Sequence, residues 1–359
     1  MMNQPEFHDL PGLLAAPFPR RRAITLVAGS LLGGALGPRS RSAAAAAHVQ
    51  AGTFDGSSIS NSPGGRAGNA LFGGFTRTRV TTTGAEINVV YGGSGPPVLL
   101  LHGAPQTHAM WHAVAPRLAE HHTVVAADLR GYGDSSKPPG GGDHADYSFR
   151  AMASDQLEVM HALGHERFAL VGHDRGARVA HRLALDHPDA VERMAVLDIV
   201  PTSYVYGHAD RRLATLYFHW FFLIQAEPLP ERLIGGDPLF FVRRILSFSG
   251  GLDAYAPEAL AEYERCFVEP ATIRGLCEDY RAAASIDLEH DEAGRDRRVA
   301  CPLLLLWGAR GAVGALYQPL EVWRSFATDV RGRALDAGHF LAEERPHDTL
   351  TELEPFLAC

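Results

Sequence analysis

Short apolar runs recur along the chain from residue 76, and segments with helical spacing lie between them. The β-rich segments 76–80 and 85–91 flank a Thr-Gly pair, which predicts a hairpin. Five continuous apolar runs follow, at 97–101, 124–128, 168–171, 194–197 and 303–306. Such runs are typical of strands that are buried on both faces of a parallel sheet. Their alternation with helical segments such as 150–163 and 175–187 predicts βαβ units.

Residues 203–286 interrupt this alternation. The stretch is aromatic, contains prolines and has helix-like spacing without a strand of the same type. It predicts a helical cap that is inserted after the sixth strand. The expected fold class is therefore α/β, with a mostly parallel sheet flanked by helices, a core formed by residues 75–202 and 287–359, and a cap formed by residues 203–286.

The first 74 residues differ in composition from the rest of the chain. Arg20-Arg21-Arg22 precede a modestly apolar run at 23–36 and an Ala-rich tract. This layout resembles a twin-arginine signal peptide over residues 1–47 and predicts export to the periplasm; the alternative is a disordered tail on a cytoplasmic protein. The run is too short for a comfortable membrane span. Residues 48–74, rich in Gly, Ser and Asn, are predicted to be a linker.

Charge and cysteine content narrow the classes of partner. The formal net charge is -8, and Lys and Arg do not cluster outside the N-terminus, which argues against nucleic-acid binding. No C-x-x-C pair occurs, so we expect free, buried thiols without a zinc site at Cys266, Cys277, Cys301 and Cys359. No cofactor motif or metal-ligand spacing is present, and no cofactor is expected. The oligomeric state is open, and a homodimer is one of the states that the sequence allows.

The apolar run at 168–171 leads directly into Gly172-His173-Asp174-Arg175-Gly176, after which helical spacing begins. A strand, a sharp turn between glycines and a helix are the context of a nucleophile elbow. Esterases place serine at its centre, whereas this chain has Asp174. A serine that attacks saturated carbon would leave an ether, but an aspartate leaves an ester that water can cleave. Asp174 therefore predicts displacement at a carbon–halogen bond or an epoxide.

His339 lies in the segment Asp336-Ala-Gly-His339-Phe, after a short predicted strand at 333–335. The chain order of nucleophile, acid and histidine predicts that His339 is the general base that activates the hydrolytic water. No carboxylate follows the run at 303–306, so we predict that Asp198, which follows the run at 194–197, orients the imidazole. Asp336 is the alternative.

Arg175 and Arg178 follow the nucleophile at the start of the predicted helix, where both can face one pocket. A carboxylate nucleophile repels an anionic substrate by about 4 kcal/mol at roughly 4 Å in a partly screened site. Two arginines can reverse the sign and grip a substrate carboxylate. The alternative is that one or both pair with a structural carboxylate such as Asp128 or Asp134.

Several longer strings of residues resemble those of one enzyme family. They are His102-Gly-Ala-Pro-Gln-Thr-His-Ala-Met-Trp111, Asp128-Leu-Arg-Gly-Tyr-Gly-Asp-Ser-Ser-Lys-Pro138, Gly172-His-Asp-Arg-Gly176, Leu197-Asp-Ile-Val-Pro-Thr202, His219-Trp220 and Cys277-Glu-Asp-Tyr-Arg-Ala282. From residue 75 onward the chain resembles the fluoroacetate dehalogenases, a haloacetate-dehalogenase family with the α/β-hydrolase fold. The resemblance implies hydrolysis of a small halogenated carboxylic acid, such as fluoroacetate or chloroacetate, to glycolate and halide.

The same resemblance implies a role for each matching residue. It makes Asp174 the nucleophile, Asp198 and His339 the hydrolytic pair, and Arg175 and Arg178 the grip on the substrate carboxylate. It also implies that the departing halide is bound by donors on His219, Trp220 and Tyr280. Without the resemblance, His219 and Trp220 read as ordinary packing of the cap.

The ester-cleaving step needs two backbone N–H groups for its oxyanion, and Ala104 and Arg175 are the candidates because they follow His102-Gly103 and the nucleophile. An aromatic residue commonly follows that His-Gly pair. The small Ala104 predicts a roomier pocket and leaves open the preference for fluoroacetate over chloroacetate or larger 2-haloacids.

Two other functions use parts of the same pattern. An epoxide hydrolase shares the elbow aspartate and activates the epoxide oxygen with cap tyrosines, for which Tyr204, Tyr206 and Tyr280 are candidates. It has no obvious use for two arginines beside the nucleophile. A non-catalytic receptor on the same fold need not keep a nucleophile, an acid and a base together.

Overall fold

The computed structural model describes residues 59–60 and 71–358, which form the predicted α/β fold. Within these residues one sheet has the strand order β1-β2-β3-β5-β4-β6-β7-β8-β9. The strands are β1 (Ile59–Ser60), β2 (Thr76–Thr81), β3 (Glu86–Gly93), β4 (Pro97–Leu101), β5 (Thr123–Ala127), β6 (Phe168–His173), β7 (Val191–Leu197), β8 (Leu303–Gly308) and β9 (Val330–Leu335). The first three strands pair in antiparallel fashion, β3 is antiparallel to β5, and all remaining neighbours are parallel.

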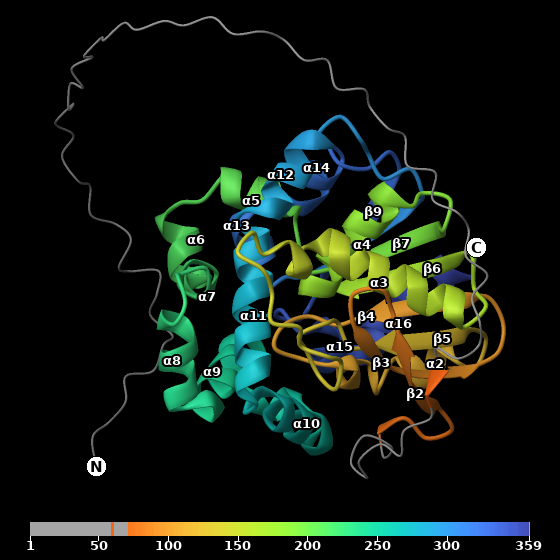
Figure 1. Cartoon of the computed structure of the whole chain (residues 1–359). Coiled ribbons are helices and arrows are strands. Elements are labelled where there is room, and N and C mark those ends of the chain that lie inside the picture. The colour runs from red at the N-terminus through yellow and green to blue at the C-terminus, as the bar shows by residue number, and fades with distance from the viewer. Residues whose placement is uncertain (1–58, 61–70, 359) are drawn as a thin grey trace, which may run out of the picture. The chain divides into compact units, whose positions relative to one another are not determined.

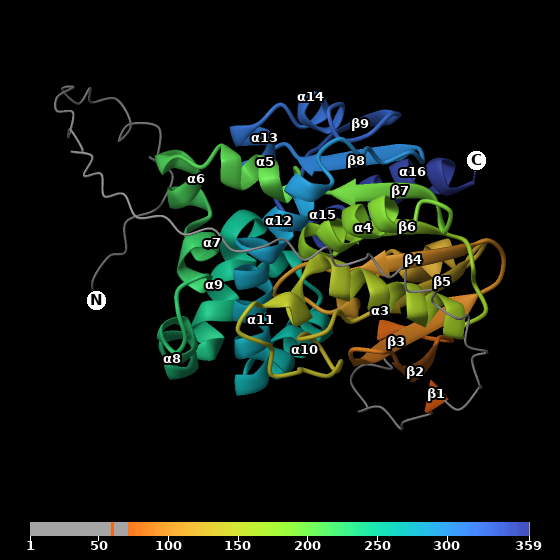
Figure 2. The same cartoon turned by 45° about the horizontal axis from the view of Figure 1, so that its top comes forward.

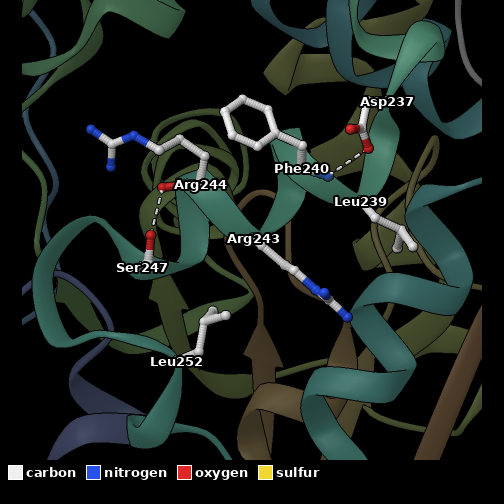
Figure 3. Close-up of a pocket in the computed structure, with 7 residues that line it drawn as sticks. All are labelled: Asp237, Leu239, Phe240, Arg243, Arg244, Ser247 and Leu252. Carbon is white, nitrogen blue, oxygen red and sulfur yellow. Dashed lines mark hydrogen bonds between the residues drawn. The ribbon is translucent and has the colours of Figure 1, made fainter. Parts of the chain in front are cut away.

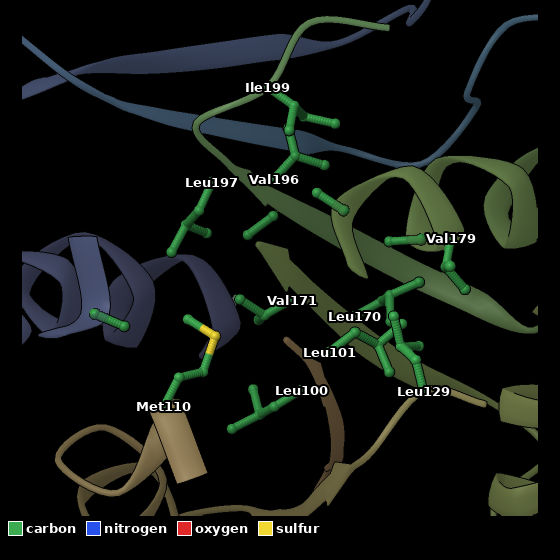
Figure 4. Packing of buried hydrophobic residues seen from close by; sticks show 14 of the residues in the cluster. Leu100, Leu101, Met110, Leu129, Leu170, Val171, Val179, Val196, Leu197 and Ile199 are labelled. Carbon is green, nitrogen blue, oxygen red and sulfur yellow. The ribbon is translucent and has the colours of Figure 1, made fainter. Parts of the chain in front are cut away.

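The parallel strands are buried because their apolar side chains point to both faces of the sheet. Leu100 and Leu101 on β4, Leu170 and Val171 on β6, and Val196 on β7 have no exposed surface and pack against one another (Figure 4). Complete burial of one such side chain stabilises the fold by about 1.5–3 kcal/mol. This packed layer holds the ends of the strands in fixed positions.

Helices lie on both faces of the sheet, with α3 and α4 in front of it and α16 behind it (Figures 1 and 2). The helices that belong to this core are α2 (Ala115–Leu118), α3 (Phe149–Ala162), α4 (Asp174–Asp186), α13 (Ala312–Leu316), α14 (Pro319–Trp323), α15 (Leu341–Glu344) and α16 (Pro346–Leu357), with the 3-10 helices η4 (His108–Trp111) and η5 (Ala145–Tyr147). Ser148 begins α3 by accepting a hydrogen bond from the Ala151 N–H group, which is the usual way to satisfy a leading N–H group.

A set of helices without strands lies between β7 and β8. They are α5 (Thr202–Gly207), α6 (Arg211–Leu216), α7 (Phe218–Leu223), α8 (Leu229–Gly236), α9 (Pro238–Gly250), η6 (Leu252–Ala254), α10 (Pro257–Phe267), α11 (Pro270–Ala283) and α12 (Ile286–Ala293). The arrowheads of β7 and β8 point toward this cap (Figure 2). The last helix, α12, packs against α5 and α11, so the helical insertion continues past the predicted boundary at residue 286.

Two features differ from the expected order of elements. Ile59–Ser60 forms a strand that pairs with β2, within the range predicted to be linker, so the cap follows the seventh described strand. Phe72 is buried and its ring lies 5.5 Å from that of His108, so core packing begins before residue 75. A two-residue strand has no periodicity to detect, since pairing with its neighbour alone defines it. The predicted signal peptide lies outside the described residues.

Candidate active site

The turn at Asp174 joins a buried strand to a helix. β6 ends one residue before Asp174, α4 begins there, and Asp174 has a φ of 44°, in the left-handed region. Such a conformation costs of the order of 1–3 kcal/mol for a residue with a side chain and persists only where its surroundings impose it. A Cβ on Gly176 would lie 2.5 Å from the carbonyl oxygens of Leu101 and His102. Glycine is therefore required two positions after Asp174, as the elbow motif predicts.

The Asp174 carboxylate is 6% exposed, and one of its oxygens is already bound. The Ala104 N–H group donates to Oδ2 at 3.1 Å. Burial alone would raise the pKa of Asp174, but His339 and Arg178 lower it to about 2. The other predicted oxyanion donor, the backbone N–H of Arg175, lies in the first turn of α4, where leading N–H groups have no partner within the helix. The carboxylate is therefore ionised at neutral pH.

His339 and Asp198 meet although different parts of the chain supply them. His339 Nδ1 lies 2.6 Å from Asp198 Oδ2, and the Gly308 N–H group donates to Asp198 Oδ1 at 2.9 Å. Burial disfavours the charged imidazole, but Asp198 and the nucleophile outweigh it and raise the pKa of His339. Asp336 is exposed and pairs with Arg310, so the structure places Asp198, and not Asp336, against the histidine.

The Arg175 guanidinium is fully buried against a carboxylate. Its Nε donates to Asp279 Oδ2 at 2.8 Å, and its Nη2 donates to Asp279 Oδ1 and, at 2.9 Å, to the Asp279 backbone oxygen. Nη1 has no protein partner. The alternative prediction, that one of the two arginines pairs with a structural carboxylate, therefore holds for Arg175. Its partner is Asp279, and not Asp128 or Asp134. Because Asp279 balances its charge, Arg175 keeps little net charge, and its Nη1, with two N–H bonds, is the guanidinium nitrogen without a partner among the described residues.

Arg178 has neutral partners. Its Nη1 donates to the Val200 carbonyl oxygen and to Thr202 Oγ1, both at 3.0 Å, and its Cζ lies 4.6 Å from the centre of the Trp220 ring. Its Nε is buried without a partner, and no ion pair to Arg178 is found within the described part of the chain. Burial lowers the pKa of Arg178, yet a guanidinium stays protonated in proteins. Arg178 therefore carries a positive charge that no ion pair within the described residues balances.

The three predicted halide donors lie close together within the cap, on α7 and α11. The ring centroids of His219 and Trp220 each lie 5.9 Å from that of Tyr280. His219 Nδ1 is buried without a partner, and burial lowers the pKa of His219 to about 4, so the ring is neutral. Burial and the nearby Asp174 raise the pKa of Tyr280, so its hydroxyl keeps the proton that it can donate.

A surface cleft on α9 lies apart from these residues. It has a volume of about 410 Å³, and none of the predicted site residues is among its lining residues Asp237, Leu239, Phe240, Arg243, Arg244, Ser247 and Leu252 (Figure 3). Among residues 59–60 and 71–358, no group of His, Cys, Asp and Glu is arranged to hold a metal ion, and no helix is long and apolar enough to cross a membrane. Cys266 and Cys277 are buried free thiols, Cys301 is a half-buried one, and Cys359 lies outside the described residues.

A family model described as the alpha/beta hydrolase fold matches residues 96–346. The chain belongs to the α/β-hydrolase-fold family. Fluoroacetate dehalogenase of a Burkholderia sp is 50% identical over 80% of this chain and 95% of its own length, which confirms the resemblance to that group. Soluble epoxide hydrolase of Corynebacterium sp. (strain C12) is 34% identical over 79% of this chain and 98% of its own. A solved alpha/beta hydrolase from Nostoc sp PCC 7120 is 56% identical, covers 79% of this chain and 98% of its own, and has a TM-score of 0.78.

Two residues of this α/β-hydrolase site were missed by the sequence reasoning. Asp279, which pairs with Arg175, directly precedes Tyr280. Its position next to a predicted halide donor is the sequence feature that could have indicated a place in the site. His173 directly precedes the nucleophile, and its Nε2 lies 2.8 Å from the backbone oxygen of His339. Burial lowers the pKa of His173 to about 3, so a neutral ring joins the elbow to the segment that carries the base.

Proposed function

We propose that this α/β hydrolase converts a small 2-haloacid, such as fluoroacetate or chloroacetate, to the corresponding 2-hydroxyacid and halide. The observation that carries the proposal is the ionised elbow carboxylate of Asp174, which accepts a hydrogen bond from the Ala104 N–H group and lies near the Arg178 guanidinium, whose hydrogen-bond partners are neutral. The 50% identity to a fluoroacetate dehalogenase over most of both chains supports it.

In the first step, Oδ1 of Asp174 attacks the carbon that bears the halogen. A carbon–oxygen bond forms, the carbon–halogen bond breaks, and the halide leaves with the electron pair. Arg178 and Nη1 of Arg175 hold the substrate carboxylate. Donors on His219, Trp220 and Tyr280 meet the charge that develops on the halogen, where preorganised hydrogen bonds lower the barrier most.

In the second step, a water attacks the carbonyl carbon of the Asp174 ester and its proton passes to Nε2 of His339. The Ala104 N–H group binds the oxyanion, which forms on the oxygen that it already contacts. Collapse breaks the bond between the carbonyl carbon and Oδ1, and the hydroxyacid leaves with this oxygen and with the proton from His339. Asp174 now holds the oxygen of the water and releases the remaining proton of that water to solvent, which restores its carboxylate. Asp198 holds the imidazole in the required tautomer throughout.

The deciding experiment measures halide release by the full chain from fluoroacetate and from chloroacetate. We expect release by the wild type and by the exposed control variant Asp189→Asn, and none by Asp174→Asn, because an amide is a far weaker nucleophile. Chloride release alone would restrict the enzyme to weaker carbon–halogen bonds. No halide from either acid, with diol formed from a small epoxide, would instead establish an epoxide hydrolase, the activity named for the relative from Corynebacterium.

We also propose that residues 1–47 direct export through a twin-arginine signal, on the support of Arg20-Arg21-Arg22 and the apolar run after them. Replacing Arg21 and Arg22 by lysine should keep the mature enzyme out of the periplasmic fraction. Unchanged fractionation would contradict export by this route.

The predicted homodimer is tested separately, by measuring the mass of the purified enzyme in sedimentation.

A further inference from the structure

The segment that carries His339 is held by side chains through its backbone. The N–H groups of Gly338 and Phe340 donate to the two oxygens of Glu344, at 2.6 and 3.1 Å. The N–H group of His339 donates to Ser249 Oγ at 2.8 Å, and the Ser249 hydroxyl in turn donates to Glu344 at 3.1 Å. Ser249 lies near the end of α9, in the cap. One cap hydroxyl therefore binds both the base's own peptide and the carboxylate that holds its neighbours.

The packing around Ser249 leaves little room for another arrangement. A Cβ on Gly338 would lie 2.3 Å from the Ser249 Cβ, and a Cβ on Gly250 would lie 2.9 Å from the Glu344 Cδ. The carbonyl oxygen of His339 is held from the other side by His173, which precedes the nucleophile. The peptide of the base is therefore fixed between the elbow and the cap.

We propose that Ser249 is a positioning residue for His339, so that the cap takes part in ester hydrolysis as well as in binding the substrate. The inference rests on the proposed haloacid reaction. His339 must keep Nδ1 on Asp198 while Nε2 faces the attacking water, and a misplacement of about 1 Å is enough to slow such a step greatly. Displacement of halide by Asp174 does not use the imidazole as a base, so Ser249 acts on the second step alone.

The test separates the two steps in Ser249→Ala. We expect the first turnover of halide to keep its wild-type rate, while ester hydrolysis slows by roughly five- to tenfold, as for the loss of one hydrogen bond. Mass spectrometry of the quenched enzyme should then show the ester on Asp174 accumulating, as it should fully in His339→Ala. Ser247→Ala is the matched control, because its hydroxyl on the same helix donates only to the Arg244 carbonyl oxygen. It should behave as the wild type.

A second variant and a spectroscopic measurement cover the case in which Ser249→Ala alters the cap. Glu344→Gln removes one acceptor oxygen from the carboxylate that binds the Gly338 and Phe340 N–H groups and the Ser249 hydroxyl. It should therefore also slow ester hydrolysis and leave the first turnover of halide unchanged. The exposed Glu354→Gln should change neither step. Proton NMR should show the deshielded His339 Nδ1–H resonance weakened or shifted in Ser249→Ala.

Three outcomes overturn the inference, and they differ from one another. Equal slowing of halide release and ester hydrolysis would make Ser249 a general stabiliser of the cap. Unchanged hydrolysis with an unchanged Nδ1–H resonance would show that the contact does not position the base. A wild-type enzyme that releases no halide would remove the proposed function and this inference with it.

Discussion

Arg175 and Arg178 are neighbours on one turn of α4, yet the charge that each offers to a ligand differs. Asp279 occupies two nitrogens of Arg175, so the guanidinium is a rigid group with one remaining donor. Arg178 is bound by uncharged oxygens and faces the Asp174 carboxylate, whose pKa it lowers. In the proposed reaction, capture of the anionic substrate would therefore depend on Arg178 for charge and on Arg175 for the orientation of the carboxylate.

The two catalytic steps should separate with pH. Asp174 stays ionised down to a pH of about 2, so halide displacement continues in acid. His339 accepts a proton only when neutral, and its pKa is raised because Asp198 and Asp174 outweigh the effect of burial. Ester hydrolysis should thus fail as the pH falls through the pKa of His339, and the Asp174 ester should accumulate. Rapid-quench measurement of halide and adduct across the acidic range checks this; loss of both steps at one pH would contradict it.

At the scale of elements, the elbow holds its strained residue because strand and helix approach too closely for any other geometry. β6 pairs with β4 on one side and β7 on the other, and α4 starts against the end of β4. The backbone N–H group of Gly176 donates to the His102 carbonyl oxygen at 2.9 Å. This contact joins the start of α4 to the segment whose Ala104 N–H group donates to Asp174.

Gly176→Ala tests that close approach. The new methyl group would meet two backbone carbonyl oxygens at 2.5 Å, and backbone cannot rotate away as a side chain can. We expect the free energy of unfolding to fall by about 1–3 kcal/mol, as for an overpacked core, with loss of halide release. Gly235→Ala on α8 meets no atom within 4 Å and should change stability by less than about 1 kcal/mol. Denaturant unfolding measures both; equal stabilities would contradict the argument.

At the scale of the whole molecule, a buried carboxyl group joins the cap to the core. Glu343 on α15 is 7% exposed, and its Oε1 accepts hydrogen bonds from the Tyr263 hydroxyl on α10 and, at 3.2 Å, from Gln106 Nε2 in the segment before η4. Burial raises the pKa of Glu343 to about 8, against the effect of these two donors. At neutral pH the group is therefore mostly uncharged, so this contact between cap and core does not bury a charged carboxylate.

Glu343 should make stability depend on pH. A carboxyl whose pKa is higher in the folded than in the unfolded state contributes stability that is complete below about pH 4.5 and is lost as the pH rises to about 8. At about 1.4 kcal/mol per pKa unit, the loss reaches at most roughly 5 kcal/mol. Glu343→Gln keeps the acceptor oxygen but cannot ionise, so its stability relative to the wild type should rise over this range. Urea unfolding at several pH values measures the difference, and parallel pH profiles would contradict it.

The amino-acid sequence predicts the chemistry of the site and the order of the core elements. Apolar runs, the glycines around Asp174 and the residues around His339 act over a few positions of the chain, so their pattern predicts strands, the elbow and a base without knowledge of the fold. It did not reveal the two-residue strand β1 or the full length of the helical insertion, because pairing and packing with distant residues define them.

Which side chains contact one another depends on the tertiary fold. His339 could have been paired with Asp336 three positions away, but the fold brings it to Asp198, 141 positions distant. Arg175 was expected to serve the substrate, and the fold gives it Asp279, 104 positions away, as a partner. The hold of Ser249 on the base likewise crosses 90 positions. Hydrogen bonds and ion pairs form wherever chain packing brings the groups together, and sequence spacing does not encode that distance.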